Sequence, residues 1–364
     1  MEINATALKI PFKVTFKHAR AERKQTQSIF VTVKRNYHIG LGEACPREYV
    51  TGETVASCLQ WIENNIEIIS NCCTNILTLK AWVKIYRSNI DRNPSAWCAI
   101  ELALLDLFAK EENKTVEQLL SLDSSAGIYH YSAVIGDGND QAFSQTLAKY
   151  KQFGFLDYKL KVSGDLKSDN LRIQQIRALS EKVSIRLDAN NLWGNNIDGA
   201  VTYLKGIEYS LMAVEEPLDV RNFYGVQQLS DLLNLPVIFD ESVCHVQDLN
   251  RVSLPHKNCI INVRISKMGG LLRSLEIIDQ IKQRGFKIII GCLVGETSLL
   301  SRVALIAAHY SGNYLIAQEG AFGDLLLEYD FVEPMIRFGE KGLFEFKETV
   351  QSETGWGLKM SSVV

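Results

Sequence analysis

From about residue 128 onward, short apolar segments of strand length alternate with amphipathic helical segments. Helical patterns at 170–181, 198–207 and 271–285 lie between these segments. The eight predicted strands are 128–136, 157–162, 183–189, 209–216, 235–241, 259–265, 286–292 and 314–319. Eight strands that alternate with helices favour a (β/α)8-type TIM barrel over an open sheet. An open sheet would need a glycine-rich phosphate loop after its first strand, and the glycines of VIGDGND have the wrong spacing for one.

The first third of the chain has a different pattern, in which strands come before helices. Strand-like segments at 3–16, 28–35 and the stretch ending in IGLGEA precede helical patterns at 53–69, 77–88 and 95–112. This order is typical of an α+β unit. The tail is irregular and ends in the strand-like segments GLFEF and LKM. We therefore predict an α/β protein with an N-terminal α+β domain at 1–125, completed by the tail at about 330–364, and a barrel at 126–330.

Three acidic residues end consecutive apolar segments of the predicted barrel. They are Asp188 in VSIRLDAN, Glu215 in LMAVEEP and Asp240 in LPVIFDES. About 25 residues separate each from the next, which is the length of one strand, one helix and two short loops. The spacing therefore places the three carboxylates at the C-terminal ends of three neighbouring parallel strands. In a barrel these ends face one mouth, where active sites are built.

Three carboxylates at one mouth would repel each other unless a cation lies between them. Oxygen ligands suit a hard ion, so we predict one divalent cation, Mg²⁺ first and Mn²⁺ as an alternative. Two of the three assignments also have an alternative: Asp188 could cap a helix, and Glu216 could be the ligand in place of Glu215. We prefer Glu215 because it precedes the Glu-Pro turn from within the strand.

Two lysines, Lys159 and Lys161, alternate along the second predicted barrel strand, DYKLKV. Alternation points both side chains to the same face of the sheet. If the strand is shorter than predicted, both lysines lie on the rim. If they face the interior, a partly desolvated lysine beside a divalent cation can lose its proton and act as a base. This arrangement suits removal of a proton alpha to a carboxylate, with the metal stabilising the enediolate that forms.

Composition narrows the range of partners and compartments. The 364 residues carry a net charge of −3 with 22% charged residues, so a broad basic face for nucleic acid is not expected. The chain has no run of 18 apolar residues, which disfavours a membrane span. The N-terminus lacks a long apolar signal segment, and most of the 8 cysteines lie in apolar segments. We expect reduced core cysteines, a cytoplasmic location, a small-molecule carboxylate as substrate and a homo-oligomer.

The motifs KLK, LDAN, EEP and DES, in this order and at these spacings, resemble the enolase superfamily in its muconate-lactonizing subgroup, which holds muconate cycloisomerases and dipeptide epimerases. HARAERKQTQSIFVTV with IGLGEACP resembles the start of the capping domain, and SAWCAIELALLDLFAK resembles the helix before the barrel. GGLLRSLEI and GCLVGETS also match. The resemblance implies that Asp188, Glu215 and Asp240 bind Mg²⁺, that Lys161 is a general acid and base, and that Lys159 supports it electrostatically. FKIIIGCL lacks the histidine of mandelate-racemase-type members.

One position departs from the subgroup. Members of the subgroup that this chain resembles typically have the motif NIK-x-x-K-x-GG after the third metal ligand, and the first lysine of that motif is the second catalytic base. This chain has NVRISKMGG at the same place. Arg264 therefore replaces that base, and Lys267 follows three residues later, past the predicted strand end. Arginine stays protonated and is a poor base, but it can hold a carboxylate. Two-base racemisation is in doubt, whereas cycloisomerisation, its reverse or syn elimination needs Lys161 alone.

Several further residues are candidates for the surroundings of the site. We expect Arg264 across the mouth from Lys161, held by an acidic neighbour such as Glu241 or by substrate. The segment IAQEGAFGD lacks the D-x-D pair with which dipeptide epimerases hold a substrate ammonium. The residues expected beside the metal ligands and lysines are Asn190, Glu241 and Lys267, and those expected to contact substrate are Arg20, Tyr49, Glu296 and Glu319.

Three functions remain open. The first is a Mg²⁺-dependent isomerase or lyase that uses Lys161. The second is an amino-acid or dipeptide epimerase or racemase in which Arg264 or Lys267 serves the opposite face. The third is a catalytically impaired barrel that binds carboxylates. The basic loop at about 16–27 favours an anionic substrate, or it is a solvated surface loop.

Overall fold

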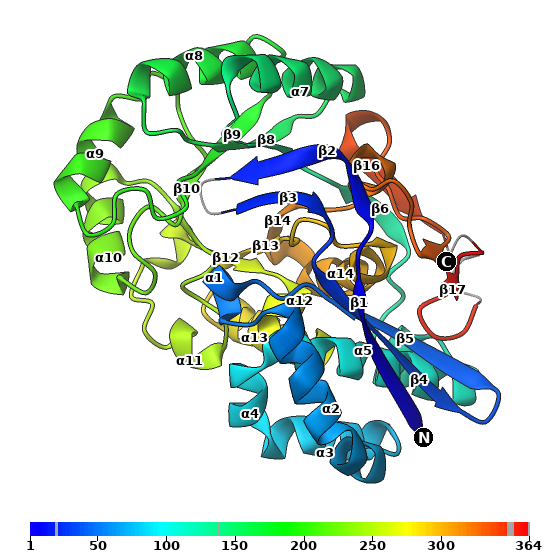
Figure 1. Ribbon diagram of the computed structural model, residues 1–364. Helices are drawn as coiled ribbons and strands as arrows, with labels where there is room; N and C mark the ends of the chain where they lie inside the picture. Colours follow the sequence, from blue (N-terminus) through cyan, green and yellow to red (C-terminus); the bar gives the residue numbers. More distant parts are fainter. Residues whose placement is uncertain (19–20, 137, 348–352, 363–364) are drawn as a thin grey trace.

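The computed structural model describes residues 1–18, 21–136, 138–347 and 353–362. Its N-terminal part is a three-stranded antiparallel sheet in the order β1 (Glu2–Leu8), β4 (Ser28–Arg35) and β5 (His38–Ala44). Between β1 and β4, the strands β2 (Pro11–His18) and β3 (Ala21–Gln25) form a hairpin that Figure 1 shows extending across the barrel. The helices of this part are α1 (Glu48–Thr51), α2 (Val55–Cys72), α3 (Ile76–Ile85), α4 (Arg87–Arg92), α5 (Pro94–Glu111) and α6 (Val116–Leu120).

The second part is an eight-stranded parallel sheet in sequence order. Its strands are β7 (Ala133–Ile135), β8 (Asp157–Lys161), β9 (Ser184–Asp188), β10 (Ala213–Glu215), β11 (Val237–Phe239), β12 (Cys259–Val263), β13 (Lys287–Ile290) and β14 (Leu315–Gln318). The ring closes where Ser132 N donates to Gln318 O at 2.8 Å, beside a parallel bridge between Tyr131 and Gln318. The predicted barrel class is therefore confirmed.

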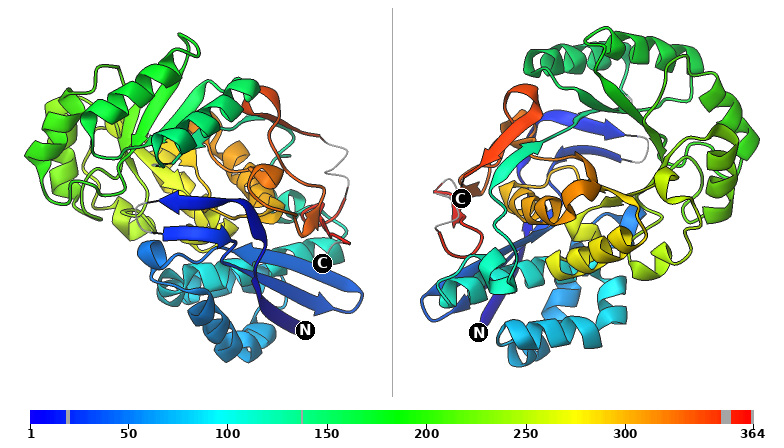
Figure 2. Two further views of the ribbon diagram at one scale, coloured as in Figure 1. Left: turned by 45° about the horizontal axis from the view of Figure 1, so that its top comes forward. Right: turned by 180° about the vertical axis from the view of Figure 1, so that it is seen from behind.

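An outer layer of helices surrounds this sheet (Figure 2). The helices are α7 (Asp140–Phe153), α8 (Leu166–Arg177), α9 (Ile197–Lys205), α10 (Phe223–Leu233), α11 (Val246–Leu249), α12 (Ile265–Met268), α13 (Leu271–Gln283) and α14 (Ser298–Ser311). Short polar side chains fix where several of them begin, because each accepts a bond from an unpaired first-turn N–H. Asn139 caps α7, Asp165 caps α8 and Asn196 caps α9.

Two features of the barrel differ from the prediction. The expected first strand at 128–136 is two strands, because β6 (Gly127–His130) leaves the barrel to pair with β16 (Leu343–Phe346) of the tail. After β14, the described chain forms the 3-10 turn η3 (Gly323–Leu325) where an eighth helix would stand. The remaining tail elements are β15 (Val332–Glu333), η4 (Glu340–Gly342) and β17 (Lys359–Met360), and two further 3-10 turns, η1 (His256–Asn258) and η2 (Gly312–Tyr314), lie within the barrel.

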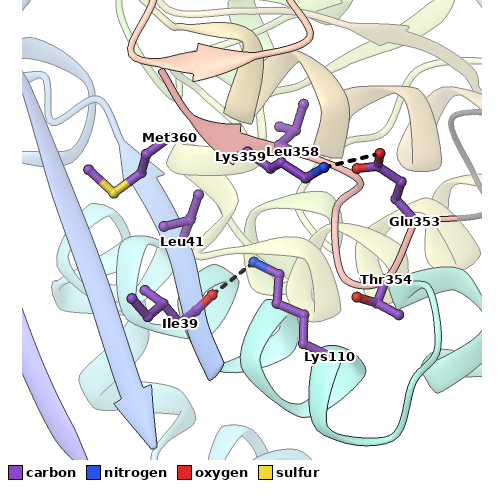
Figure 3. A pocket seen from close by; sticks show the side chains of 8 residues that line it. All are labelled: Ile39, Leu41, Lys110, Glu353, Thr354, Leu358, Lys359 and Met360. Atoms are coloured by element: carbon purple, nitrogen blue, oxygen red, sulfur yellow. Dashed lines mark hydrogen bonds and ion pairs between the residues drawn. The ribbon is translucent and has the colours of Figure 1, made fainter. Parts of the chain in front are cut away.

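The tail returns to the N-terminal part and packs on α5. Trp356 N donates to Asp106 Oδ1 at 2.8 Å, and Trp356 Nε1 donates to Leu41 O at 3.1 Å. A hollow of about 500 Å³ lies beside these contacts, between β5, α5 and the tail (Figure 3). Its rim residues Ile39 and Lys110 are joined, because Lys110 Nζ donates to Ile39 O at 2.8 Å. None of the residues that line the hollow is one of the predicted site residues.

Close packing of β5 on α5 holds the N-terminal part against the barrel. A Cβ atom at Gly42 would meet Ala99 O at 1.9 Å, so only glycine permits this approach. At the end of β5, Glu43 reaches the first turn of α14. Thr297 Oγ1 donates to Glu43 Oε2 at 2.6 Å, and Thr297 N donates to Oε1 at 3.1 Å. The carboxyl group of Glu43 thus joins the two parts.

Glu43 gives a prediction for the pH dependence of stability. Burial, together with the charges of Glu296 and Asp330, raises the pKa of Glu43 from 4.5 to about 8 despite the bonds from Thr297. A carboxyl group whose pKa is higher in the folded state stabilises most at acidic pH, and this contribution is lost as pH rises from about 4.5 to about 8. We expect Glu43→Gln to lose less stability than the wild type between about pH 5 and pH 8.5. Urea unfolding midpoints across this range measure the difference, and equal slopes for both proteins would contradict it.

All eight cysteines are unpaired, as expected, although Cys72 is exposed. Among the described residues, none of the helices has both the length and the apolar composition needed to cross a membrane. The cytoplasmic location and the homo-oligomer stay predictions.

Candidate active site

The inward faces of β8 and β9 carry alternating charges. In the sheet register, Lys159 lies beside Arg186 and Lys161 lies beside Asp188. Lys159 is buried, and its Nζ lies 2.8 Å from Glu215 Oε1, 3.3 Å from Asp188 Oδ2 and 3.5 Å from Glu319 Oε1. Burial alone would lower the pKa of Lys159, but these three carboxylates raise it well above its usual range. Lys159 is therefore a fixed cation.

Lys161 lies two residues closer to the C-terminal end of β8, and so to the barrel mouth, than Lys159. Its Nζ donates to Asp188 Oδ2 at 2.8 Å and to Asn190 Oδ1 at 2.5 Å. Its side chain is 12% exposed, whereas that of Lys159 is 3% exposed. Of the two lysines, Lys161 is thus the one that a molecule entering the mouth can reach. Asn190, predicted as a neighbour of the metal ligands, thus contacts Lys161, and its N donates to Asp188 Oδ1 at 3.2 Å.

Arg264 follows β12 and projects into the same mouth, four strands around the barrel from Lys161. Its Nη2 forms an ion pair with Asp240 Oδ2 and lies 3.6 Å from Glu215 Oε1. The predicted acidic partner, Glu241, is not the one observed: Asp240, a predicted metal ligand, takes that place. The reason is that Asp240 directly follows β11, the strand hydrogen-bonded to β12.

Lys267, predicted past the strand end, lies in α12 after β12 and is fully buried. Its Nζ donates to Asp240 O at 2.6 Å, to Asn262 O at 2.7 Å and to Asp240 Oδ1 at 3.0 Å. These three acceptors use all three ammonium protons. Lys267 therefore positions Asp240 through these bonds.

The three predicted metal ligands differ in electrostatic environment. Burial would raise the pKa of Asp188, but the charges of Lys159 and Lys161 outweigh it and hold the pKa below its usual range. Arg264 and Lys267 likewise hold the pKa of Asp240 below its usual range against burial. Burial raises the pKa of Glu215 to about 8, because Lys159 compensates it incompletely and other carboxylates surround it.

The site can be tested for its fit to a divalent cation. Asp188, Glu215 and Asp240 offer only oxygen donors, as Mg²⁺ prefers. Glu215 Oε2 is buried and has no hydrogen-bond partner among the described residues, so one ligand atom is available. No group of three or more His, Cys, Asp or Glu side chains in the described part of the chain is spaced to hold a metal as it stands. The donor set suits the ion, and in this structure cations pair with all three carboxylates: Lys159 with Glu215, Lys161 with Asp188 and Arg264 with Asp240.

The carboxyl group of Glu216, the alternative ligand, is fully occupied by hydrogen bonds from the loop after β11. Its Oε1 accepts from Asp240 N at 2.7 Å and from Ser242 N at 2.8 Å, and its Oε2 accepts from Ser242 Oγ at 2.7 Å. Glu216 therefore shapes the loop that presents Asp240, which supports the preference for Glu215. Glu241 is buried beside this loop, and its Oε2 has no partner in the described structure.

A second charged layer lies below the mouth, and we did not predict it. Arg186 is fully buried and pairs with Asp157 Oδ2 at 2.6 Å and with Glu319 Oε1 at 2.8 Å. Glu319 is thus held by Arg186 and Lys159 inside the barrel, rather than left free for a substrate cation as predicted. The alternation of SIRLD, with Arg186 two residues before Asp188, was a signal that could have revealed this layer.

The remaining substrate candidates are Tyr49, Glu296 and Arg20. Tyr49, in α1, has its ring 5.8 Å from Arg23 Cζ. Glu296 follows β13 and accepts from Leu293 N at 2.7 Å, and burial raises its pKa to about 7. Arg20 lies outside the described residues.

Comparisons with known proteins agree with this architecture. The model of the family described as enolase C-terminal domain-like matches residues 142–362. A hydrophobic dipeptide epimerase of Enterococcus faecalis is 27% identical over 311 residues, which are 84% of this chain and 86% of that protein.

Solved structures extend the likeness to the whole chain. A dipeptide epimerase from Enterococcus faecalis, complexed with Mg and the dipeptide L-Leu-L-Tyr, has a TM-score of 0.82 and 25% identity, with 98% of both chains covered. Muconate lactonizing enzyme from Pseudomonas fluorescens has a TM-score of 0.84 and 19% identity, with 100% of this chain and 96% of that chain covered. The second likeness concerns the fold alone. The chain therefore belongs to the enolase C-terminal domain-like family and is an isomerase of the enolase superfamily.

Proposed function

We propose that this protein removes a proton alpha to a substrate carboxylate with Lys161 as the base, with one Mg²⁺ held by Asp188, Glu215 and Asp240. The observation that carries the proposal is the difference among the three lysines of the site. Lys159 and Lys267 are buried and surrounded by acceptors, whereas Lys161 reaches the mouth. The related dipeptide epimerase structure that is complexed with Mg supports the choice of ion.

When bound, Mg²⁺ would supply positive charge for the substrate carboxylate and for the negative charge that develops there as the proton leaves. Lys159 would keep Asp188 ionised and would oppose the effect of burial on the pKa of Glu215, because its Nζ contacts both carboxylates. Asn190 would orient the amine of Lys161 through their hydrogen bond. Arg264 would turn from Asp240 toward the substrate, as a fixed cation on the far side of the mouth.

The surroundings of Lys161 and Arg264 favour chemistry on one face of the substrate. A base opposite Lys161 would be needed to deliver a proton to the other face, and that place is taken by Arg264, which stays protonated. Lys267 Nζ is buried and bonded to three protein acceptors, so it does not face the substrate. Lys161 would therefore remove and return protons on the same face, as in cycloisomerisation, its reverse or syn elimination.

Epimerisation or racemisation is the second candidate, and the relatives favour it. The Enterococcus faecalis relative is a dipeptide epimerase, and a Bacillus cereus protein that is 23% identical over 371 residues is an N-succinyl-L-Arg/Lys racemase. Inversion would need a proton carrier opposite Lys161, for which the described residues provide Arg264. A carboxylate-binding protein without catalysis is the third candidate.

Deuterium exchange separates the three candidates. The protein is incubated in D₂O with Mg²⁺ and a panel of small carboxylates, N-acyl amino acids and dipeptides, and mass spectrometry follows uptake of one deuterium. We expect uptake or conversion with Mg²⁺ and none with EDTA. Binding without exchange or conversion of any compound would contradict the proposal in favour of a binding protein. Inversion at the alpha carbon would favour an epimerase.

A further inference from the structure

Arg264 occupies an oxygen atom that a divalent cation at the proposed site would need. Asp240 Oδ1 accepts a hydrogen bond from Lys267 Nζ at 3.0 Å, and Lys267 is fully buried. The other oxygen, Asp240 Oδ2, forms the ion pair with Arg264 Nη2. This nitrogen also lies 3.6 Å from Glu215 Oε1, so it stands between two of the three proposed ligands. A metal ion lies about 2.0–2.6 Å from its oxygen ligands, so an ion held by Glu215 and Asp240 competes with Arg264 for the space between them.

Arg264 is also the cation best placed to leave this position. Among the cations that contact Glu215 or Asp240, the side chain of Arg264 is 11% exposed, that of Lys159 is 3% exposed and that of Lys267 is 0% exposed. Arg264 lies directly after β12, at the mouth, rather than within the strand. Its Nε is buried without a hydrogen-bond partner among the described residues. The guanidinium is therefore only partly satisfied where it stands.

Glu241 offers a second place for this guanidinium. It follows Asp240 in the chain and is 4% exposed, and its Oε2 is buried without a hydrogen-bond partner in the part of the chain that the structure describes. Burial and the charge of Asp240 raise the pKa of Glu241, and the charge of Arg264 acts against this rise. The charge of Arg264 therefore reaches Glu241. A buried carboxyl oxygen and a buried guanidinium nitrogen, each without a partner, can satisfy one another.

We infer that Arg264 is a gate of the metal site with two positions, one on Asp240 when no ion is bound and one on Glu241 when an ion takes Asp240 Oδ2. The inference rests on the proposed function, which supplies the three metal ligands, and it adds a link between ion binding and the placement of the cation opposite Lys161. An ion that displaced Arg264 without a second carboxylate to receive it would leave a buried unpaired charge, which is costly. Glu241 removes that cost.

A double-mutant cycle of Mg²⁺ affinity, measured by calorimetry, tests the gate without turnover. Arg264→Gln should bind Mg²⁺ about tenfold or more tightly than the wild type, because a competing group reduces apparent affinity by the fraction of time that it blocks the site. Glu241→Gln should bind Mg²⁺ about tenfold more weakly, because the displaced guanidinium has no carboxylate to receive it. In the Arg264→Gln background, Glu241→Gln should change the affinity by less than about threefold. A static arginine that only repels the ion predicts additive effects instead.

An ion pair far from the mouth provides matched controls. Arg87 Nη2 lies 2.6 Å from Glu276 Oε1, and the two side chains, which join α4 to α13, are 34% and 36% exposed. Arg87→Gln and Glu276→Gln remove the same charges as the two test variants. Both controls should bind Mg²⁺ within about twofold of the wild type, because solvent screens exposed charges.

Crystal structures with EDTA and with Mg²⁺ show the two positions directly, and they keep the gate testable if Arg264→Gln does not fold. In EDTA, the guanidinium of the wild-type protein should pair with Asp240. In Mg²⁺, it should lie about 3 Å from a carboxyl oxygen of Glu241. An arginine that stays on Asp240 in the Mg²⁺-bound protein would overturn the gate.

The affinities separate failure of the gate from failure of the proposed function. If the wild type binds Mg²⁺ and Arg264→Gln binds it equally or more weakly, the gate is overturned while the metal ligands stand. Additive effects in the cycle would overturn the role of Glu241 as the second partner, and with it the two-position gate. If none of the four proteins of the cycle binds Mg²⁺, the metal site of the proposed function is contradicted and the gate is overturned with it.

Discussion

Replacement of Lys161 by alanine is expected to lower alpha-proton exchange by about 10²- to 10⁴-fold, the usual contribution of a general base. Lys161 is the amine at the barrel mouth, with Nζ 2.8 Å from Asp188 Oδ2. Mg²⁺ affinity should stay within about threefold of the wild type, because the three proposed ligands remain and Lys159 still contacts Asp188 and Glu215. Deuterium uptake measured by mass spectrometry and Mg²⁺ titration by calorimetry check the two parts.

Lys167→Ala is the matched control, since this lysine is exposed at the start of α8 and contacts none of the site residues. It should exchange at the wild-type rate. Undiminished exchange by Lys161→Ala would mean that another group, such as a bound water, is the base. Lost exchange together with lost Mg²⁺ binding would instead assign Lys161 to support of the metal ligands.

Replacement of Lys159 by methionine is expected to destabilise the metal-free protein by about 3–5 kcal/mol. The reason is that Lys159 Nζ lies within 3.5 Å of carboxylate oxygens of Asp188, Glu215 and Glu319, and its loss leaves these buried groups facing one another. Saturating Mg²⁺ should restore part of the loss, because a cation would again lie among the carboxylates. Urea unfolding with Mg²⁺ and with EDTA measures both effects.

Lys167→Met is the control for the loss of a lysine at an exposed site, and its stability should change by less than about 0.5 kcal/mol. A Lys159→Met protein as stable as the wild type in EDTA would show that the carboxylates bind protons in place of the lysine. Stability that does not respond to Mg²⁺ in either protein would contradict the assignment of Asp188, Glu215 and Asp240 as ligands.

The placement of the carboxylates and lysines could be predicted because it follows from backbone periodicity alone. A repeat of about 25 residues puts Asp188, Glu215 and Asp240 at consecutive strand ends, and alternation puts Lys159 and Lys161 on one face. The structure has Asp188 and Glu215 paired in register and both lysines inside the sheet. These features depend on local geometry that any barrel strand imposes.

The partners of Arg264 and Lys267 could not be predicted, because they depend on side-chain packing between strands far apart in sequence. Arg264 pairs with Asp240, and Lys267 also bonds to Asp240. Lys267 lies in the short helix α12, and the sequence ISKM does not predict this helix. For the same reason Glu319 was expected to meet substrate, whereas its true partners, Arg186 and Lys159, come from β9 and β8.

The stereochemistry of deuterium incorporation by the wild-type protein tests one-face chemistry by Lys161 most directly. A substrate identified by the exchange screen is incubated with Mg²⁺ in D₂O, and nuclear magnetic resonance with chiral chromatography locates the deuterium. With Arg264 opposite Lys161 as a fixed cation, deuterium should enter on one face only, and the configuration of the remaining substrate should be retained. Rapid incorporation into both enantiomers would show that a second base operates and would contradict the assignment of Arg264.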